Sequence, residues 1–285
     1  MGGSSAVEEG TYRGSWRMWT RAPAPVLHGA VADYHGFVVD SGEPVSDTVL
    51  PAPTITLILT FGDELRMERM PGSDEAGGTF GSFVAGLHDG PGVIAHDGHQ
   101  AGLQVDLSPL AAGALLDVRL DALTGDVVPL DALLGRAGDE LAERLAEAPD
   151  WSSRFALLDD ILSRRLAGTR APTPEVAQAW QTIHRTGGTV RVADLAREIG
   201  WSRRHLAARF RAEIGLGPKA VGRLVRFSRA RWMLSSGRAR SLTDVALACG
   251  YYDHAHLDRE FRALAGGPPS LVGVPPPPTL VDAEG

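Results

Sequence analysis

The 285-residue chain has a single cysteine, Cys249, and no apolar run long enough to span a membrane. One cysteine excludes a disulfide framework and any zinc site built from several cysteines. A transmembrane helix needs about 20 apolar residues in succession, and none are present. The opening residues, MGGSSAVEEG, lack the basic and apolar regions of a signal peptide. We therefore expect a soluble, cytoplasmic protein.

Lysine is almost missing too, because Lys219 is the only lysine among 28 basic residues. This skew towards arginine indicates coding bias, so an arginine-rich segment carries less weight here than in an average chain. Hydrophobic residues make up 44% of the chain, which is enough to build a packed core and excludes general disorder. The length favours two domains over one.

The net charge of −7 argues, as an average, against a polyanionic partner, but the charge is segregated. Residues 172–270 contain 16 Lys+Arg and 8 Asp+Glu, a balance of +8. Residues 1–171 contain 12 and 25, a balance of −13, and the tail contributes −2. A basic module is therefore attached to an acidic one.

The two halves also differ in their predicted secondary structure. Short apolar runs broken by Gly, Pro and Asp predict strands over 30–39, 54–61, 79–87 and 101–107, which is typical of a small barrel or sandwich. Helical patterns follow over 107–118, 131–148 and 151–166. After a Pro-rich linker the chain is predicted to form short helices only. The fold class is thus α+β in two domains, a β-barrel-like domain with trailing helices and an all-α domain.

An internal repeat lies in the basic half. LAREIGWSRRHLAARFRAEIGLGP, from Leu195, aligns with VALACGYYDHAHLDREFRALAGGPP, from Val245, and Gly200 matches Gly250. Each copy predicts a short helix, a glycine-containing turn and a second helix, the form of a helix-turn-helix whose second helix enters a DNA major groove. Two copies joined by a helix could address two groove segments about one DNA turn apart.

Helical geometry predicts which side chains face outward. With Leu206 and Phe210 in the core, the outward residues of the first copy are Arg204, Ala208 and Arg211; those of the second are Ala255, Arg259 and Arg262. Arginine suits bidentate guanine readout and phosphate binding. We expect Arg204 and Arg259 to contact bases. We expect Arg203, Arg211 and Arg262 to contact phosphates, because they lie towards the flanks.

These residues resemble the double helix-turn-helix module of the AraC/XylS transcription regulators. The matching stretches are LAREIGWSRRHLAARFRAEIG, RLVRFSRARWML and SLTDVALACGYYDHAHLDREFRALAGGPPS. Carried over by position, the resemblance implies base readout by Arg204, Ala207 and Ala208 in the first copy and by His254, Ala255, Asp258 and Arg259 in the second. The alanines offer only apolar contact, and Asp258 has two possible partners, a cytosine amino group or Arg262. GSFVAGLHDGP and GLQVDLSPLAAGALLDVRLDALTGDVVPLDALLG resemble, more weakly, the β-barrel-like, cupin-like domain that precedes this module in many members.

The resemblance implies a sequence-specific regulator that binds double-stranded operator DNA, with a small-molecule effector, RNA polymerase and a second copy of the chain as further partners. The domains expected are a flexible N-terminus (1–12), a regulatory or dimerisation domain (13–168), a linker (169–174), the DNA-binding domain (175–270) and a Pro-rich tail (271–285). Two alternatives remain open: a regulator whose N-terminal domain only oligomerises, and a cupin-type metal enzyme fused to a DNA-binding module.

The residues themselves favour a non-enzymatic protein without cofactor or metal. No glycine-rich phosphate loop or nucleophile elbow is present. His96 and His99, with His88 nearby, could suggest a metal site, but they flank Asp97-Gly98, which predicts a surface hairpin. Cys249 falls on a buried stripe and is expected to be inert. No effector-binding residue can be assigned, although five side chains among the early strands could line or fill a barrel: Trp16, Trp19, Tyr34, His35 and Phe37.

Overall fold

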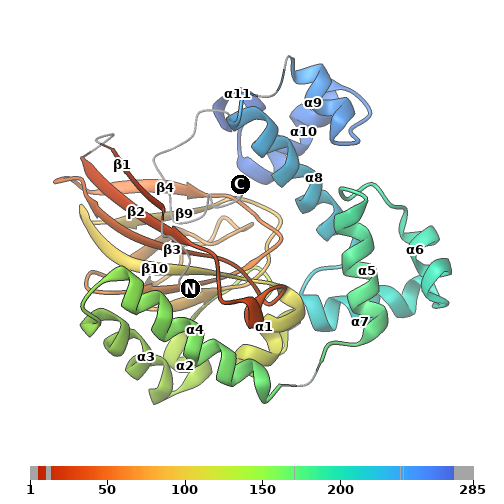
Figure 1. The fold of residues 1–285 in the computed structure, drawn as a ribbon. Helices are drawn as coiled ribbons and strands as arrows, with labels where there is room; N and C mark the ends of the chain where they lie inside the picture. Colours follow the sequence, from red (N-terminus) through yellow and green to blue (C-terminus); the bar gives the residue numbers. More distant parts are fainter. Residues whose placement is uncertain (1–5, 11–13, 170, 238, 240, 273–285) are drawn as a thin grey trace.

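The computed structural model describes residues 6–10, 14–169, 171–237, 239 and 241–272. A β-rich part with helices on one side is followed by a purely helical part (Figure 1). Most of the predicted Pro-rich tail lies outside the described residues, and α11 (Pro269–Val272) covers its first two positions. Residues 6–10 of the predicted flexible N-terminus instead form strand β1 (Ala6–Gly10), which is paired along its length with β2 (Ser15–Arg21).

Two antiparallel sheets face each other, which agrees with the predicted barrel-like architecture. The seven-stranded sheet has the order β1-β2-β3-β10-β5-β8-β11 and adds β3 (Val31–Asp40), β10 (His99–Leu107), β5 (Ile55–Thr60), β8 (Phe83–Ala85) and β11 (Val127–Pro129). The four-stranded sheet has the order β4-β9-β6-β7, with β4 (Val45–Val49), β9 (Gly92–His96), β6 (Leu65–Arg69) and β7 (Thr79–Phe80).

Strand alternation directs one set of side chains between the sheets and another towards the helices. On β5, Ile58 packs against Leu65, Met67 and Ile94 of the smaller sheet. Its neighbours Leu57 and Leu59 belong to the larger core on the helical side. β5 is therefore buried on both faces, which explains its nearly continuous apolar sequence.

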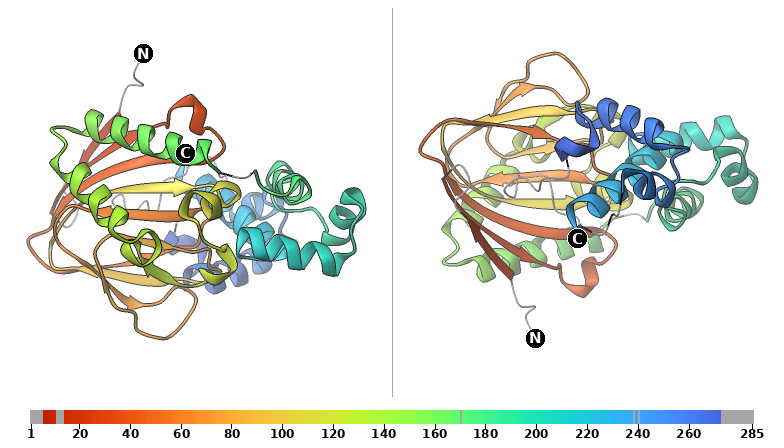
Figure 2. Two further views of the ribbon diagram at one scale, coloured as in Figure 1. Left: turned by 90° about the horizontal axis from the view of Figure 1, so that it is seen from below. Right: turned by 90° about the horizontal axis from the view of Figure 1, so that it is seen from above.

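Helices cover the outer face of the seven-stranded sheet (Figure 2). They are α1 (Pro109–Leu116), α2 (Leu130–Leu134), α3 (Arg136–Glu147) and α4 (Trp151–Ala167), with short 3-10 turns η1 (Pro25–Leu27) and η2 (Leu120–Ala122). Trp151 lies directly on Gly36, where a Cβ would be 2.3 Å from the indole ring. Only glycine at this position of β3 lets α4 pack so closely.

Buried polar contacts attach α4 to the sheet. Asp159 of α4 accepts hydrogen bonds from the Tyr34 hydroxyl (3.1 Å), the Arg21 guanidinium (2.9 Å) and the Ala24 amide (2.8 Å). Trp19 stacks on Trp151 with ring centroids 4.5 Å apart. Tyr34 and Trp19, named above as possible lining of the barrel, thus serve the junction between sheet and helix.

The remaining helices are α5 (Pro174–Arg185), α6 (Val192–Ile199), α7 (Arg203–Ile214), α8 (Pro218–Ser235), α9 (Leu242–Ala248) and α10 (His254–Ala265). α8 joins two helical groups, α5 to α7 at one end and α9 to α11 at the other (Figure 1). One continuous hydrophobic cluster extends from the β-rich part into these helices, and includes both Leu120 and Phe210. In the described part of the chain, no helix is long and apolar enough to cross a membrane.

Candidate nucleic-acid interface

The first predicted helix-turn-helix is formed by α6, a short turn and α7. α6 ends at Gly200, whose φ of +79° is the left-handed conformation that glycine adopts without strain. Ser202 then caps α7, because its hydroxyl accepts the His205 amide at 3.2 Å. Leu206 and Phe210 are fully buried, as the apolar spacing predicts.

The second unit repeats this construction with α9 and α10. Ser241 caps α9 by accepting the Asp244 amide at 3.1 Å, and Asp253 caps α10 by accepting the His256 amide at 2.7 Å. Leu257 and Phe261 are fully buried, in the places of Leu206 and Phe210. The repeat seen in the sequence is therefore also a repeat in structure.

An aromatic residue and a histidine meet in both turns. Trp201 packs edge-on against His205 at 4.5 Å, and Tyr251 packs edge-on against His256 at 5.3 Å. His256 also accepts the Tyr252 amide through Nδ1. Both histidine rings thus pack against the aromatic residue of their turn, and the His256 ring also accepts a hydrogen bond.

On α7, all five predicted DNA-binding positions are exposed while the N-terminal domain is in place. They are Arg203, Arg204, Ala207, Ala208 and Arg211. No ion pair involves the three arginines within the described residues. Their guanidinium groups are therefore available to bases or phosphates.

On α10, four of the five predicted positions are exposed: His254, Ala255, Arg259 and Arg262. The fifth, Asp258, is half-buried and pairs with Arg262, whose Nε lies 2.9 Å from its carboxylate. Of the two partners considered for Asp258, the structure therefore shows the intrahelical arginine. The positive charge of Arg262 is largely compensated, whereas Arg259 has no ion pair in the described part of the chain.

α8 fixes the separation of the two units. Its 18 residues span about 27 Å at 1.5 Å per residue, comparable with the roughly 34 Å of one DNA turn. Arg226, on α8, donates to the Gly188 carbonyl beside the first unit at 2.6 Å and lies 5.7 Å from the Tyr251 ring of the second. One side chain thus contacts both groups of helices.

Two residues of this surface escape the sequence prediction. Tyr252 is 87% exposed and directly precedes Asp253, the cap of α10. Its neighbour Tyr251 is buried, and no periodicity in a turn distinguishes the two. Glu213 of α7 accepts the amide and hydroxyl of Thr173 and so attaches the linker to the first unit.

Cys249 is buried beneath α8, with Sγ 3.7 Å from the Met233 sulfur. Burial raises the pKa of the Cys249 thiol. The thiol is therefore protonated near neutral pH, as expected for an inert core cysteine.

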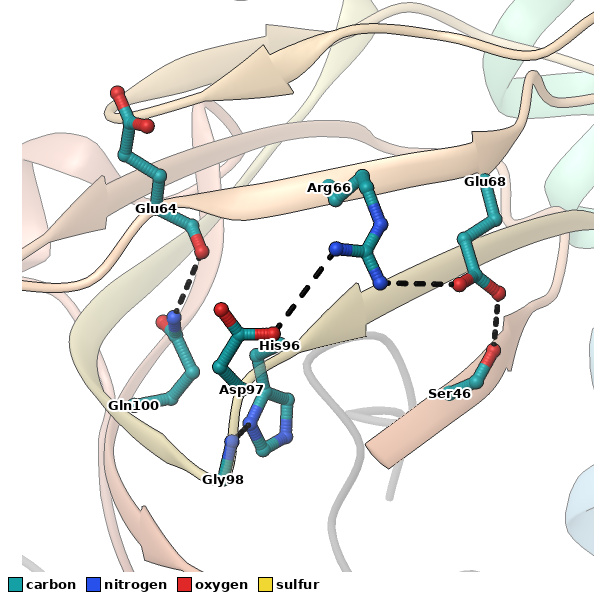
Figure 3. A network of polar contacts seen from close by, with 8 residues as sticks. All are labelled: Ser46, Glu64, Arg66, Glu68, His96, Asp97, Gly98 and Gln100. Atoms are coloured by element: carbon teal, nitrogen blue, oxygen red, sulfur yellow. Dashed lines mark hydrogen bonds and ion pairs between the residues drawn. The ribbon is translucent and has the colours of Figure 1, made fainter. Parts of the chain in front are cut away.

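The histidines of the N-terminal domain do not converge. His96 Nδ1 accepts the Gly98 amide at 3.2 Å (Figure 3). His99 instead contacts Asp63, and His88 contacts the Gly90 carbonyl. Within the described residues no group of three His, Cys, Asp or Glu is placed to hold a metal ion. The neighbouring Arg66 instead bridges Asp97 and Glu68.

The predicted surface hairpin at Asp97-Gly98 is wrong. β9 belongs to the four-stranded sheet and β10 to the seven-stranded sheet, so the two strands do not pair. Gly98, with φ +108°, makes a corner that carries the chain from one sheet to the other. His96 is buried at this corner, because it sits at the end of a strand that faces the second sheet.

Two loops of the β-rich domain contact the helix-turn-helix units at equivalent places. The Thr124 hydroxyl donates to the Gly215 carbonyl, which follows α7, at 2.8 Å. In the second unit, a Cβ at Gly266, which follows α10, would lie 3.6 Å from Pro91. Gly215 and Gly266 are matching positions of the repeat. The N-terminal domain therefore contacts the C-terminal ends of α7 and α10, which we call the reading helices.

An ion-pair group strengthens the second contact. Arg223 of α8 lies 2.9 Å from Glu260 of α10 and 3.6 Å from Asp89 of the β-rich domain. The two contacting loops are themselves tied by backbone hydrogen bonds, from Gly86 to the Asp126 carbonyl and from Gly125 to the Leu87 carbonyl. Both units thus contact a pair of loops that are hydrogen-bonded to each other.

Comparisons with known proteins agree with this arrangement. Residues 195–272 match a helix-turn-helix domain family, and residues 20–129 match a family described as a domain of unknown function (DUF6597). The HTH-type transcriptional regulator GlxA of Rhizobium meliloti (strain 1021) is 29% identical over 244 residues, which cover 80% of this chain and 71% of that protein. An AraC-like transcription regulator of Streptomyces lividans is 37% identical over 97 residues, 34% of this chain and 32% of that protein.

Among solved structures, ToxT from Vibrio cholerae O395 aligns with a TM-score of 0.48 and 9% identity over 82% of this chain and 94% of that one. The C-terminal domain of AraT, a response regulator from Geobacillus stearothermophilus, gives a TM-score of 0.35 at 18% identity, covering 38% of this chain and 93% of that one. With its two helix-turn-helix units joined by α8 and preceded by a β-rich domain, the chain belongs to the AraC/XylS family of transcription regulators.

Proposed function

We propose that the protein binds operator DNA sequence-specifically by placing α7 and α10 in successive segments of the major groove. Arg204 and Arg259 contact bases, and Arg203 and Arg211 clamp phosphates. The observation that supports this most is that both units expose arginines that have no ion pair within the described residues, even with the β-rich domain in contact with both units. Ala207, Ala208 and Ala255 then add apolar contacts, and His254 and Tyr252 add polar ones.

In this proposal residues 13–168 form the regulatory domain and residues 175–270 the reading domain, with 169–174 as linker. The N-terminal domain leaves the reading faces exposed and contacts the ends of the reading helices, which supports control by orientation rather than by covering. A small-molecule effector or a second copy of the chain would act by changing these contacts. RNA polymerase is the partner through which the bound protein would alter transcription in the cytoplasm.

Selection from a random DNA pool with the full-length chain tests the proposal. We expect one enriched motif and a strong fall of affinity with salt, because each phosphate contact releases counterions. Fluorescence anisotropy then measures Kd for the selected duplex and for a shuffled duplex. Equal Kd values for both duplexes, or affinity that salt does not change, would refute specific binding.

Arginine variants separate the proposed roles. Arg203→Gln and Arg211→Gln should weaken binding to both duplexes alike and lower the salt slope by about one each. Arg185→Gln, at the C-terminal end of α5 and outside both reading helices, is the matched control and should leave both Kd values and the salt slope unchanged.

A further inference from the structure

The second helix-turn-helix unit touches the first group of helices directly, in addition to its connection through α8. The loop between α5 and α6 carries Gly188 and Thr189, and the turn between α9 and α10 carries Gly250. A Cβ at Gly250 would lie less than 3.0 Å from Thr189 Cγ2, closer than Cβ atoms pack in proteins. Only glycine therefore lets the turn of the second unit rest on the loop that precedes the first unit.

The repeat provides an internal comparison for this contact. Gly200 is the residue of the first unit that matches Gly250, and both have left-handed backbones, with φ of +79° and +75°. A Cβ at Gly200 would meet no described atom within 4 Å. The two glycines thus fulfil the same backbone requirement, but only Gly250 also makes room for the other group of helices.

Arg226 of α8 lies beside this contact and reaches both of its sides. Its Nη1 donates to the Gly188 carbonyl at 2.6 Å, and its guanidinium carbon lies 5.7 Å from the centre of the Tyr251 ring. A Cβ at Gly250 would lie 3.8 Å from Arg226 Cδ. Within the described residues, Arg226 has no ion pair and its buried Nε has no hydrogen-bond partner. The side chain is therefore held by the two groups of helices and not by a carboxylate.

Gly222 and Arg226 hold the α5–α6 loop on one face of α8. They are four residues apart, so they lie on the same side of the helix. A Cβ at Gly188 would lie less than 3.0 Å from the Gly222 carbonyl oxygen and 3.2 Å from Arg226 Cγ. The loop is thus packed closely on α8 at the point from which Arg226 extends to the second unit.

We propose that Arg226 is a positioning residue that fixes α10 relative to the first group of helices and so determines the operator spacing that the protein accepts. The effect on operator spacing rests on the proposed function, whereas the fixed separation of the two helices does not. Recognition helices contact bases with their N-terminal residues, and Tyr251 lies just before the N-terminus of α10. Arg226 therefore acts near the end of α10 that contacts bases, whereas the β-rich domain contacts the opposite end.

One base pair inserted between the two contacted segments moves the second segment by about 3.4 Å and turns it by about 35°. A rigid pair of units then loses the base contacts of one unit, whereas a loosely joined pair can follow the displaced segment. Loss of the Arg226 contacts should therefore appear as tolerance of altered spacing, while each unit keeps its base preference.

Pulsed electron paramagnetic resonance on the full-length chain, without DNA, measures the separation of the reading helices. Nitroxide labels are attached at Ala207→Cys and Ala255→Cys, which are exposed on α7 and α10, and the native Cys249 is buried. Arg226→Met keeps the apolar stem, removes the donors and should broaden the distance distribution. Arg226→Lys keeps a cationic donor and should restore the parent width, and the exposed Arg229→Met on the same helix is the matched control. Equal widths in Arg226→Met and the parent chain would refute the positioning role.

The glycine contact gives a second test that does not depend on Arg226. Gly250→Ala should shift the mean distance between the labels, because its Cβ displaces Thr189. Adding Thr189→Ser removes Cγ2, keeps the hydroxyl bond to the Thr186 carbonyl and should reverse the shift. Gly200→Ala has the same backbone strain without the neighbour and should leave the distance unchanged. An equal shift in Gly200→Ala, or a shift that Thr189→Ser does not reverse, would assign the effect to strain and overturn the contact.

Fluorescence anisotropy with the selected duplex and its one-base-pair insertion tests the consequence for DNA. The parent chain should bind the inserted duplex at least about tenfold more weakly, because one unit loses its base contacts. In Arg226→Met this ratio should fall to about threefold, a change of about 0.7 kcal/mol. An equal loss of affinity for both duplexes would indicate general destabilisation and refute the role in spacing. Failure of the parent chain to prefer the selected duplex would refute the proposed function, while the distance distributions still decide the positioning role.

Discussion

Two arginines on α10, three residues apart, offer different contacts to DNA. Arg259 is exposed and has no ion pair in the described part of the chain, whereas Arg262 donates to Asp258 at 2.9 Å. An exposed ion pair of this kind is worth little for stability, but it holds a guanidinium away from phosphate. We therefore expect Arg259 to be the stronger contact to DNA, and Arg262 the weaker one because it is paired with Asp258.

Removing the Asp258 carboxylate should make the Arg262 guanidinium available to a phosphate. In Asp258→Asn we expect tighter binding to shuffled DNA and a salt slope steeper by about 0.9, because Arg262 gains a phosphate contact. Anisotropy titrations over a range of salt concentrations measure both quantities. The double variant Asp258→Asn/Arg262→Gln completes a double-mutant cycle. If it still binds shuffled DNA more tightly than the parent chain, Arg262 does not make the additional phosphate contact.

Arg204 is the corresponding test of base readout on α7. Arg204→Ala should cost about 1–3 kcal/mol on the selected duplex and relax the preference at one base position. The loss on shuffled DNA should be smaller. A loss of equal size on both duplexes would make Arg204 a phosphate contact.

His35 gives the N-terminal domain a predictable response to acid. Burial lowers the pKa of His35 to about 4, from an ordinary value of 6.5, although the Asp106 carboxylate lies 3.6 Å from its Nε2. Between these two pH values the His35 imidazole is protonated in the unfolded chain and neutral in the native chain. The free energy of unfolding therefore falls as pH drops from 6.5 to 4, by an amount on the order of 1–3 kcal/mol.

The variant His35→Gln should show a shallower fall over the same pH window. Urea unfolding followed by tryptophan fluorescence measures the free energy of unfolding. The stacked pair Trp19 and Trp151 contributes the signal of this domain, and Trp180, Trp201 and Trp232 contribute that of the helical half. Parallel pH profiles for the variant and the parent chain would contradict the assignment.

Among the secondary-structure elements, the helices of the reading domain could be predicted closely and the strands only in part. Local signals define those helices: apolar stripes, the caps Ser202 and Asp253, and the stop at Gly200. β2, β4, β6 and β9 carry no comparable signal, because their identity depends on partners far away in the chain. The failed hairpin at Asp97-Gly98 has the same cause, since turn residues do not reveal which sheet the next strand joins.

In the candidate site, too, some features could be predicted from local sequence and others could not. Exposure of the reading faces follows from helical periodicity, which predicts it for Arg204 and Arg211 of α7. From the sequence, Arg262 could be named as one of two possible partners of Asp258, but it could not be preferred over a cytosine amino group. The contacts of Thr124 and Asp89 with the reading domain could not be anticipated, because they join separately folded regions.

The cap of α10 provides a test of a single element. Asp253→Ala should destabilise this helix by about 1 kcal/mol, since the His256 amide loses its acceptor. Asp253→Asn keeps an acceptor and serves as the control. Hydrogen exchange of the first α10 amides measures the difference, and equal protection in both variants would show that the cap is not needed.

For the molecule as a whole, the contacts of the β-rich domain should govern how rigidly the two units are spaced. Thr124→Val removes the donor to Gly215 and should let the protein tolerate one inserted base pair between the two contacted segments better than the parent chain does. Thr169→Val, which loses a bond within its own domain, is the matched control. Anisotropy with the selected duplex and its one-base-pair insertion gives the ratio; an unchanged ratio in Thr124→Val would show that the contact does not set spacing.

The contacts of the β-rich domain at Gly215 and Gly266 also limit whether the reading domain can be transferred to another protein with the same specificity. Both units meet the β-rich domain at the same position of the repeat, through Thr124 on one side and Pro91 on the other. A chimera that carries residues 175–270 behind a different N-terminal domain would keep its base contacts and lose the surface that aligns them. Such a hybrid would recognise the same half-sites at a different separation, so the operator of this protein is encoded partly outside the domain that touches it.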